Sequence, residues 1–247
     1  MTLSEINIRE KEFHNKLQSG GKKRFETIFY KAIFNAQEDF LNFLSSNTKN
    51  SEVLDYGCGD GSYAEKILKF EPKKITGIDI SEISIENAKK RAVTLNLKID
   101  YSVDNCEETK FNNDSFDIVY GTGILHHLKI DKCLIEINRI LKRNGKLAFI
   151  EPLGTNPIIN IYRKLTPKSR SVDEHPLVEK DFRYLKSKFT DVKINYYGFL
   201  TLVFFLFYRS PSKSNFFKKL VVLDKFLFKF KFFQFFAWSV LIVAKKN

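Results

Sequence analysis

The fold is decided by the run Val53-Leu54-Asp55-Tyr56-Gly57-Cys58-Gly59-Asp60-Gly61-Ser62-Tyr63, in which three glycines stand at alternate positions after a short apolar segment. Glycine tolerates positive φ and lets the backbone approach a ligand closely, so the run predicts a tight turn from a strand into a helix. The N-terminus of that helix favours a nucleotide-like ligand. The sixth place of the dinucleotide fingerprint is Ser62 rather than glycine, which weighs against a nicotinamide or flavin cofactor.

Short apolar runs alternate with helical patterns from Glu52 onward, as is typical of a parallel sheet with crossover helices. Strands are predicted at residues 53–55, 74–79, 99–103, 116–120, 147–150, 192–196 and 238–244. Helices are predicted at 62–70, 84–95 and 132–141, with Asn144-Gly145 stopping the last of them. We therefore expect an α/β fold with a Rossmann-like, doubly wound, seven-stranded and mostly parallel sheet, whose ligand lies beyond the carboxyl ends of the strands.

The chain of 247 residues is expected to form one domain. Residues 1–50 read as an N-terminal helical cap in two pieces, separated at Gly20-Gly21. Residues 51–152 form the predicted cofactor-binding core, and residues 153–247 the region on the acceptor side.

Polar side chains close the second and third predicted strands. Asp79 lies eighteen residues after Gly61, where a ribose diol requires an acceptor. Asp104 and Asn105 follow the third strand and suit the edge of an adenine ring. Three strand ends are thus expected to converge on one nucleoside.

At these motifs the chain resembles the class I S-adenosylmethionine-dependent methyltransferases, especially the branch that contains the ubiquinone and menaquinone methyltransferases. The resemblance is strong over residues 53–152, and it includes the run from Phe116 to Leu128 and the glycine turn with its strand from Leu141 to Pro152. It implies that S-adenosylmethionine is the cofactor and that the cofactor-binding residues are Asp55, Gly57, Cys58, Gly59, Gly61, Asp79, Ile80, Asp104, Asn105, Gly121 and Thr122. Cysteines such as Cys58 also serve as small packing residues.

A sulfonium methyl is already activated, so an enzyme of this type mainly positions donor and acceptor, and a base is optional. His126 and His127 follow the fourth strand, where either could contact the acceptor or have a structural role. His175, in a polar loop, competes with Glu151 as the base. His14 lies on the N-terminal segment and is read either as part of a lid or as a half-buried helix residue.

No metal site is expected. Adjacent histidines do not share a helix face, and no cluster of histidine and carboxylate with ligand spacing stands out. Cysteines 58, 106 and 133 are odd in number and widely spaced, which also excludes a disulfide framework.

An insertion rich in phenylalanine and lysine, residues 199–236, precedes the last predicted strand. It holds thirteen of the 25 phenylalanines, and between Arg209 and Asn247 nine basic residues face Asp224 alone, in a chain of net charge +12. Ser214 can cap a helix that begins at Asn215 and carries a cationic stripe of Lys218, Lys225 and Lys229. Such a helix can lie on an anionic membrane or roof an apolar pocket, or its phenylalanines can simply form a core against the sheet.

The longest stretch without a charged side chain, residues 194–208, is too short to span a membrane, and the charged N-terminus does not resemble a signal peptide. We expect a cytoplasmic protein that can attach peripherally to the inner face of the membrane. The expected reaction is methyl transfer to an apolar or lipid-linked small molecule. Nucleic acid is disfavoured as a partner because Tyr120-Gly121-Thr122-Gly123 replaces the Asn/Asp-Pro-Pro-Tyr run of amino-methylating nucleic-acid enzymes. An RNA or protein methyltransferase and a non-catalytic cofactor-binding scaffold are the alternatives.

Overall fold

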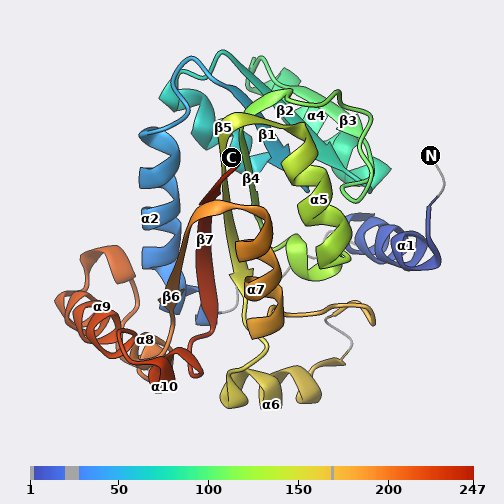
Figure 1. The fold of residues 1–247 in the computed structure, drawn as a ribbon. Coiled ribbons are helices and arrows are strands. Elements are labelled where there is room, and N and C mark those ends of the chain that lie inside the picture. The colour runs from blue at the N-terminus through green and yellow to red at the C-terminus, as the bar shows by residue number, and fades with distance from the viewer. Residues whose placement is uncertain (1–2, 20–27, 168–169) are drawn as a thin grey trace.

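A single seven-stranded sheet runs through the protein in the order β3-β2-β1-β4-β5-β7-β6 (Figure 1). The structure is a computed structural model that describes residues 3–19, 28–167 and 170–247. The strands are β1 (Glu52–Tyr56), β2 (Lys74–Asp79), β3 (Asp100–Val103), β4 (Phe116–Thr122), β5 (Leu141–Pro152), β6 (Thr190–Tyr197) and β7 (Ser239–Lys245). Neighbouring strands are parallel except where β7 lies antiparallel between β5 and β6. The predicted fold class is therefore confirmed.

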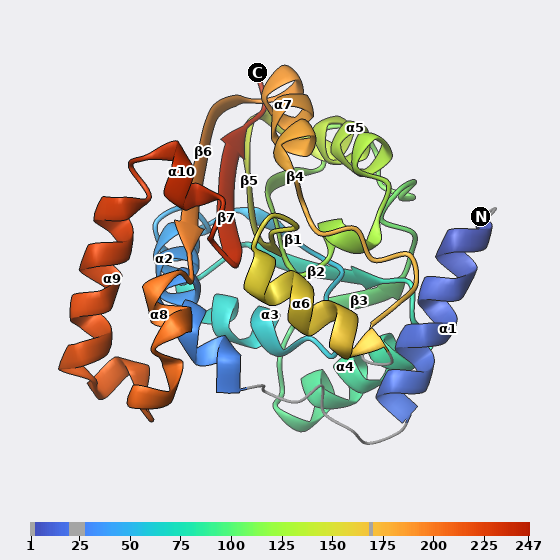
Figure 2. The ribbon, with the colours of Figure 1, turned by 90° about the horizontal axis from the view of Figure 1, so that it is seen from below.

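Helices cover both faces of the sheet. One face packs against α2 (Phe34–Ser45), α3 (Ser62–Ile67) and α4 (Glu82–Thr94), and the other against α5 (Ile130–Ile140) and α7 (Glu179–Lys188). The helix α1 (Glu5–Ser19) lies beside α4, and α6 (Pro157–Leu165) lies beyond the end of β5 (Figure 2). Among the described residues, none of the helices combines the length and the hydropathy needed to cross a bilayer.

Local sequence explains several helix starts. The Ser81 hydroxyl accepts a hydrogen bond from the Ser84 amide and caps α4. The side chain of Asn156 accepts from the amides of Ile158 and Ile159, and Pro157 occupies the first turn of α6. Neither α6 nor α7 is predicted from the sequence.

The stop signal assigned to Asn144-Gly145 was wrong. The helix α5 ends at Ile140, one residue from the predicted limit, but Asn144-Gly145 lies inside β5, where Asn144 has a φ of 63°. The register of the β4–β5 pair shifts between Phe116 and Ile118, so the Asn-Gly pair belongs to an irregularity of the strand rather than to a helix end. The predicted break at Gly20-Gly21 lies outside the described residues.

The insertion is helical, with α8 (Leu200–Val203), α9 (Asn215–Leu227) and α10 (Lys231–Gln234) stacked beside β6 (Figures 1 and 2). As expected, Ser214 caps α9 by accepting from the Phe217 amide. Asp224 is buried and accepts from the Leu200 and Thr201 amides and the Thr201 hydroxyl, so this acid holds the start of α8.

Candidate active site

The glycine turn joins β1 to α3 and presents backbone to open space. Gly57, Gly59 and Gly61 have φ of 72°, 52° and 75°. A side chain at Gly57 would collide with Ile124, and one at Gly61 with Tyr101. At Gly59, in contrast, an added Cβ would have no atom within 4 Å, so this is the point where a ligand can approach the backbone. The turn fits the predicted cofactor.

Asp79, at the end of β2, is tied to the same turn. Its carboxylate accepts from the Gly59 amide (3.0 Å) and from the Ser81 amide (2.9 Å). A carboxylate offers about four acceptor positions, so these amides do not exhaust its capacity to bind a ribose hydroxyl. Burial raises the pKa of Asp79, while the backbone amides of Ser81 and Gly59 act against that rise. Ile80 follows it, half-buried.

The residues that follow β3 close a loop. Asp104 accepts from the amides of Asn105 and Lys110 at 3.0 Å each, and the Asn105 side chain accepts from the Glu107 amide. Asp104 and Asn105 are each only 3% exposed. Sequence reasoning missed this loop-closing role, and adenine recognition by the two residues stays a prediction.

Asp55 is the most perturbed acid of the turn. Burial raises its pKa to about 7, the nearby carboxylates of Asp79 and Asp60 add to the rise, and Tyr120 opposes it. Of the other predicted cofactor residues, Cys58 and Gly121 are buried and Thr122 is half-buried at the end of β4. A Cβ at Gly121 would lie 2.7 Å from the Tyr56 carbonyl oxygen, so that glycine is required by strand packing.

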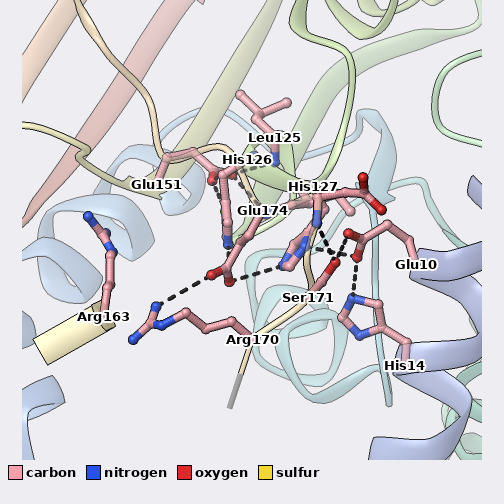
Figure 3. Close-up of polar contacts among 12 residues, drawn as sticks. Glu10, His14, Leu125, His126, His127, Glu151, Arg163, Arg170, Ser171 and Glu174 are labelled. Carbon is pink, nitrogen blue, oxygen red and sulfur yellow. Dashed lines mark hydrogen bonds and ion pairs between the residues drawn. The ribbon is translucent and has the colours of Figure 1, made fainter. Parts of the chain in front are cut away.

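Glu151, near the end of β5, organises the segment after β4 (Figure 3). It is fully buried and accepts from the amides of Ile124 (2.9 Å) and Leu125 (2.8 Å) and from Nδ1 of His126 (2.7 Å). With its oxygens engaged in this way, Glu151 is suited to position His126 rather than to act on an acceptor itself.

His126 and His127 are each 4% exposed and lie in the 3-10 turn η3 (Leu125–His127). Nε2 of His126 lies 3.4 Å from Glu174. Burial disfavours the charged imidazole, but the hydrogen bonds to Glu151 and Glu174 outweigh it, so the pKa of His126 is raised. Burial and the charge of His126 lower the pKa of His127. Of these two neighbouring imidazoles, His126 therefore binds a proton more readily than a free histidine, and His127 less readily.

His175 lies apart from this pair. Its side chain is 45% exposed, and Nε2 is 3.3 Å from Asp181 on α7. Only its backbone reaches the site, where the amide donates to the His126 carbonyl oxygen at 2.6 Å. A cavity of about 430 Å³ lies next to His175, and its lining also includes His127 and Tyr184.

The helix α1, although distant in the sequence, also contributes side chains to this site. Glu10 is 3.1 Å from Nδ1 of His127 and 3.6 Å from Nε2 of His14, and the Ser171 hydroxyl donates to its other oxygen (Figure 3). Burial alone would raise the pKa of Glu10, but the nearby imidazoles of His127 and His14 and the hydroxyl of Ser171 lower it. The i, i+4 spacing of Glu10 and His14 was the signal in the sequence for this cluster, and it was missed.

Two arginines beyond β5 were also missed. Arg163 on α6 donates to the Leu153 carbonyl oxygen, and burial together with the positive charge of Arg170 lowers its pKa to about 10. Arg170 donates to Glu174 at 3.4 Å. The Nε atoms of both arginines are buried without a hydrogen-bond partner among the described residues. They could bind an anionic or carbonyl group of an acceptor.

The seven-stranded, mostly parallel sheet is the one that the sequence predicted for a class I methyltransferase domain. Residues 54–149 match a family model described as "Methyltransferase domain", and S-adenosylmethionine is the cofactor of such a domain.

Curated relatives match the same core. The chain is 38% identical over 107 residues to a ubiquinone biosynthesis O-methyltransferase of Pelagibacter ubique, covering 43% of each protein. It is 37% identical over 110 residues to the ubiquinone/menaquinone biosynthesis C-methyltransferase UbiE of Rickettsia prowazekii, covering 41% of this chain and 44% of that protein. The matches thus span less than half the length of these relatives.

Solved structures extend the likeness of fold to nearly the whole chain. The geranyl diphosphate C-methyltransferase of Streptomyces coelicolor, solved with Mg²⁺, geranyl diphosphate and S-adenosylhomocysteine, has a TM-score of 0.69 at 14% identity and covers 99% of this chain and 98% of its own. A phosphoethanolamine N-methyltransferase of Haemonchus contortus has a TM-score of 0.66 at 18% identity, covering 95% of this chain and 60% of its own.

Proposed function

We propose that the protein transfers the methyl group of S-adenosylmethionine to an apolar or lipid-linked small molecule. The observation that carries this proposal is the open backbone at Gly59 beside Asp79, with the buried His126–Glu151 pair following the neighbouring strand β4. The names of the curated relatives, which refer to ubiquinone and menaquinone biosynthesis, support an acceptor of this chemical class.

The cofactor supplies an activated methyl group, and the residues of the chain position the reactants around it. Asp79 would accept hydrogen bonds from the ribose, and the open side of the backbone at Gly59 would lie against the cofactor. His126 is the proposed base. Glu151 holds Nδ1, and Glu174, 3.4 Å from Nε2, would stabilise the proton that Nε2 takes from the acceptor. His127 and His175 are given no direct role in this proposal.

The function is tested with S-adenosylmethionine labelled in its methyl group. The protein is incubated with a fractionated cell extract, and label is counted in the organic phase, the RNA and the protein. We expect label in the organic phase, and much less of it with Asp79→Ala, whose affinity for S-adenosylhomocysteine in calorimetry should fall about tenfold or more. Label confined to RNA or protein, or binding of cofactor without any transfer, would support one of the alternatives instead.

We further propose that the insertion attaches the protein to an anionic membrane. Its basic-aromatic surface consists of exposed lysines and apolar side chains: Lys218, Lys219, Lys229, Lys231, Leu206, Phe207, Phe216, Val222, Phe226, Phe230, Phe232 and Phe235. The lone acid of the segment, Asp224, is buried under α8 and does not offset the lysines at the surface. Positive charge interleaved with exposed aromatic rings complements an interface of anionic lipid.

Liposome flotation tests this attachment. Each lysine near an anionic bilayer contributes about 1 kcal/mol, so Lys218→Glu, Lys219→Glu and Lys229→Glu together should weaken binding by about 100-fold or more. Lys225 is left unchanged because it is 3.6 Å from Asp39. Exposed lysines outside the insertion, Lys69→Glu, Lys89→Glu and Lys98→Glu, form the matched control. Equal flotation of the two triple variants would refute attachment through the insertion.

A further inference from the structure

We propose that Glu10, His14 and His127 bind a divalent transition-metal ion. One ligand atom of each residue lies within 4.8 Å of those of the other two. The atoms nearest to Oε2 of Glu10 are Nδ1 of His127 and Nε2 of His14. The site is independent of methyl transfer, since its evidence lies in the ligand atoms alone.

The distances suit a single ion. Zinc binds histidine nitrogen at about 2.0–2.1 Å and carboxylate oxygen at about 2.0–2.2 Å, so neighbouring ligand atoms of a tetrahedral site are about 3.4 Å apart. The Glu10 oxygen lies 3.1 Å from the His127 nitrogen and 3.6 Å from the His14 nitrogen. Two imidazoles and one carboxylate are a donor set of borderline softness, which zinc, iron(II), cobalt(II) and nickel(II) accept.

Three buried polar atoms of Glu10 and His127 make no hydrogen bond to the described residues. They are Oε2 of Glu10 and both ring nitrogens of His127. The Glu10 side chain is 5% exposed and that of His127 is 3% exposed. Buried polar atoms of this kind are costly unless something satisfies them, and an ion between them would satisfy two at once.

The surroundings prepare the carboxylate for an ion. The hydroxyl of Ser171 donates to Oε1 of Glu10, which fixes the carboxylate and leaves Oε2 directed at the histidines (Figure 3). His14 is 25% exposed, so the site has a path to solvent. The ion would join α1 to the turn that carries His126.

A second group of possible ligands is a poorer candidate. His126, His127 and Glu174 also lie close together, but Glu174 accepts from Arg170, and Nδ1 of His126 is bonded to Glu151. An ion there would have to share Glu174 with the Arg170 guanidinium. The distances from Glu174 to Nε2 of His126 and Nε2 of His127 are 3.4 and 3.9 Å, against 3.1 and 3.6 Å from Glu10 to its two histidines in the first group.

The test is direct metal binding by the full chain without an affinity tag. The protein is treated with chelator, dialysed against Zn²⁺ or Co²⁺, and its metal content is measured by mass spectrometry, with the visible spectrum of bound Co²⁺ reporting geometry. We expect one ion per chain and a tetrahedral Co²⁺ spectrum. Ser171→Ala should weaken binding about 10- to 100-fold, and His14→Ala should weaken it at least as much.

The control is His175→Ala, which removes a more exposed histidine outside the cluster. It should bind zinc like the unchanged protein. Circular dichroism confirms that each variant is folded, and Glu10→Gln provides a second ligand variant if His14→Ala is not. No zinc binding at micromolar concentration, equal binding by His14→Ala and the unchanged protein, or loss on His175→Ala would each overturn the proposal.

Discussion

A few buried side chains in this protein carry several interactions each. Glu151 is the clearest, because it holds two backbone amides and one imidazole at the carboxyl end of the sheet. The sequence identified Glu151 and His126 as candidates, since both stand next to strand ends. It could not show that they contact each other, because β4 and β5 come together only when the chain folds.

Replacing Glu151 tests its structural part. Glu151→Gln removes one acceptor and places an amide donor among three N–H groups, so the free energy of unfolding should fall by about 1–3 kcal/mol. Urea denaturation measures the change. Glu108→Gln, on an exposed side chain, is the control and should have little effect. Equal stability of the two variants would show that Glu151 does not organise the turn.

Asp55 gives a prediction for pH. Its pKa is about 7 in the folded protein against 3.8 ordinarily, so between these values the folded state holds a proton that the unfolded state releases. The stability of the unchanged protein relative to Asp55→Asn should therefore be greatest below pH 4 and decrease as the pH rises to 7. The slope approaches about 1.4 kcal/mol per pH unit. The free energy of unfolding of both proteins is measured from pH 4 to 8. A difference between them that stays constant over this range would contradict the burial of an uncharged carboxyl at Asp55.

At the level of elements, the turn between β1 and α3 contains glycines that are needed for two different reasons: open space for a ligand at Gly59 and close packing at Gly61. Gly59→Ala imposes left-handed backbone on alanine, which costs about 1–2 kcal/mol, but its methyl group meets no protein atom. Gly61→Ala adds a collision with Tyr101. We expect Gly61→Ala to destabilise the protein more, and Gly59→Ala to reduce cofactor affinity about tenfold with the smaller loss of stability. Thermal unfolding and calorimetry measure the two effects, and the opposite order would contradict the assignment of the open side to the cofactor.

The elements that sequence analysis predicted well are those with a strong periodic signal, such as β2, whose predicted and observed limits coincide. Two helices were missed. The start of α6 was visible in Asn156-Pro157, a capping residue followed by proline, but the helix is only nine residues long and gives a short periodic signal. The start of α7 depends on a capping contact between Asp181 and the Val178 amide that composition does not reveal.

For the whole molecule, the sequence predicted the sheet and the strand-turn-helix at Gly57–Gly61, because a β-strand followed by a glycine turn is local information. The cluster of buried ionisable side chains after β4 was beyond its reach. Glu10, His127, Arg163 and Glu174 come from four segments, and only tertiary packing brings them together. Which phenylalanines of the insertion are buried also depends on tertiary packing. Phe217 is buried and Phe216 is exposed because of what α9 packs against.

The position of β7 has a consequence for synthesis. This strand lies between β5 and β6, although the chain makes it last of the three. Until the ribosome has released Ser239–Lys245, β6 has no neighbour in the sheet and β5 keeps one unpaired edge. The phenylalanine-rich insertion emerges during that interval, before the sheet can close. During that interval the nascent chain exposes apolar side chains together with an unpaired strand edge, the two features that make incomplete folds prone to aggregate.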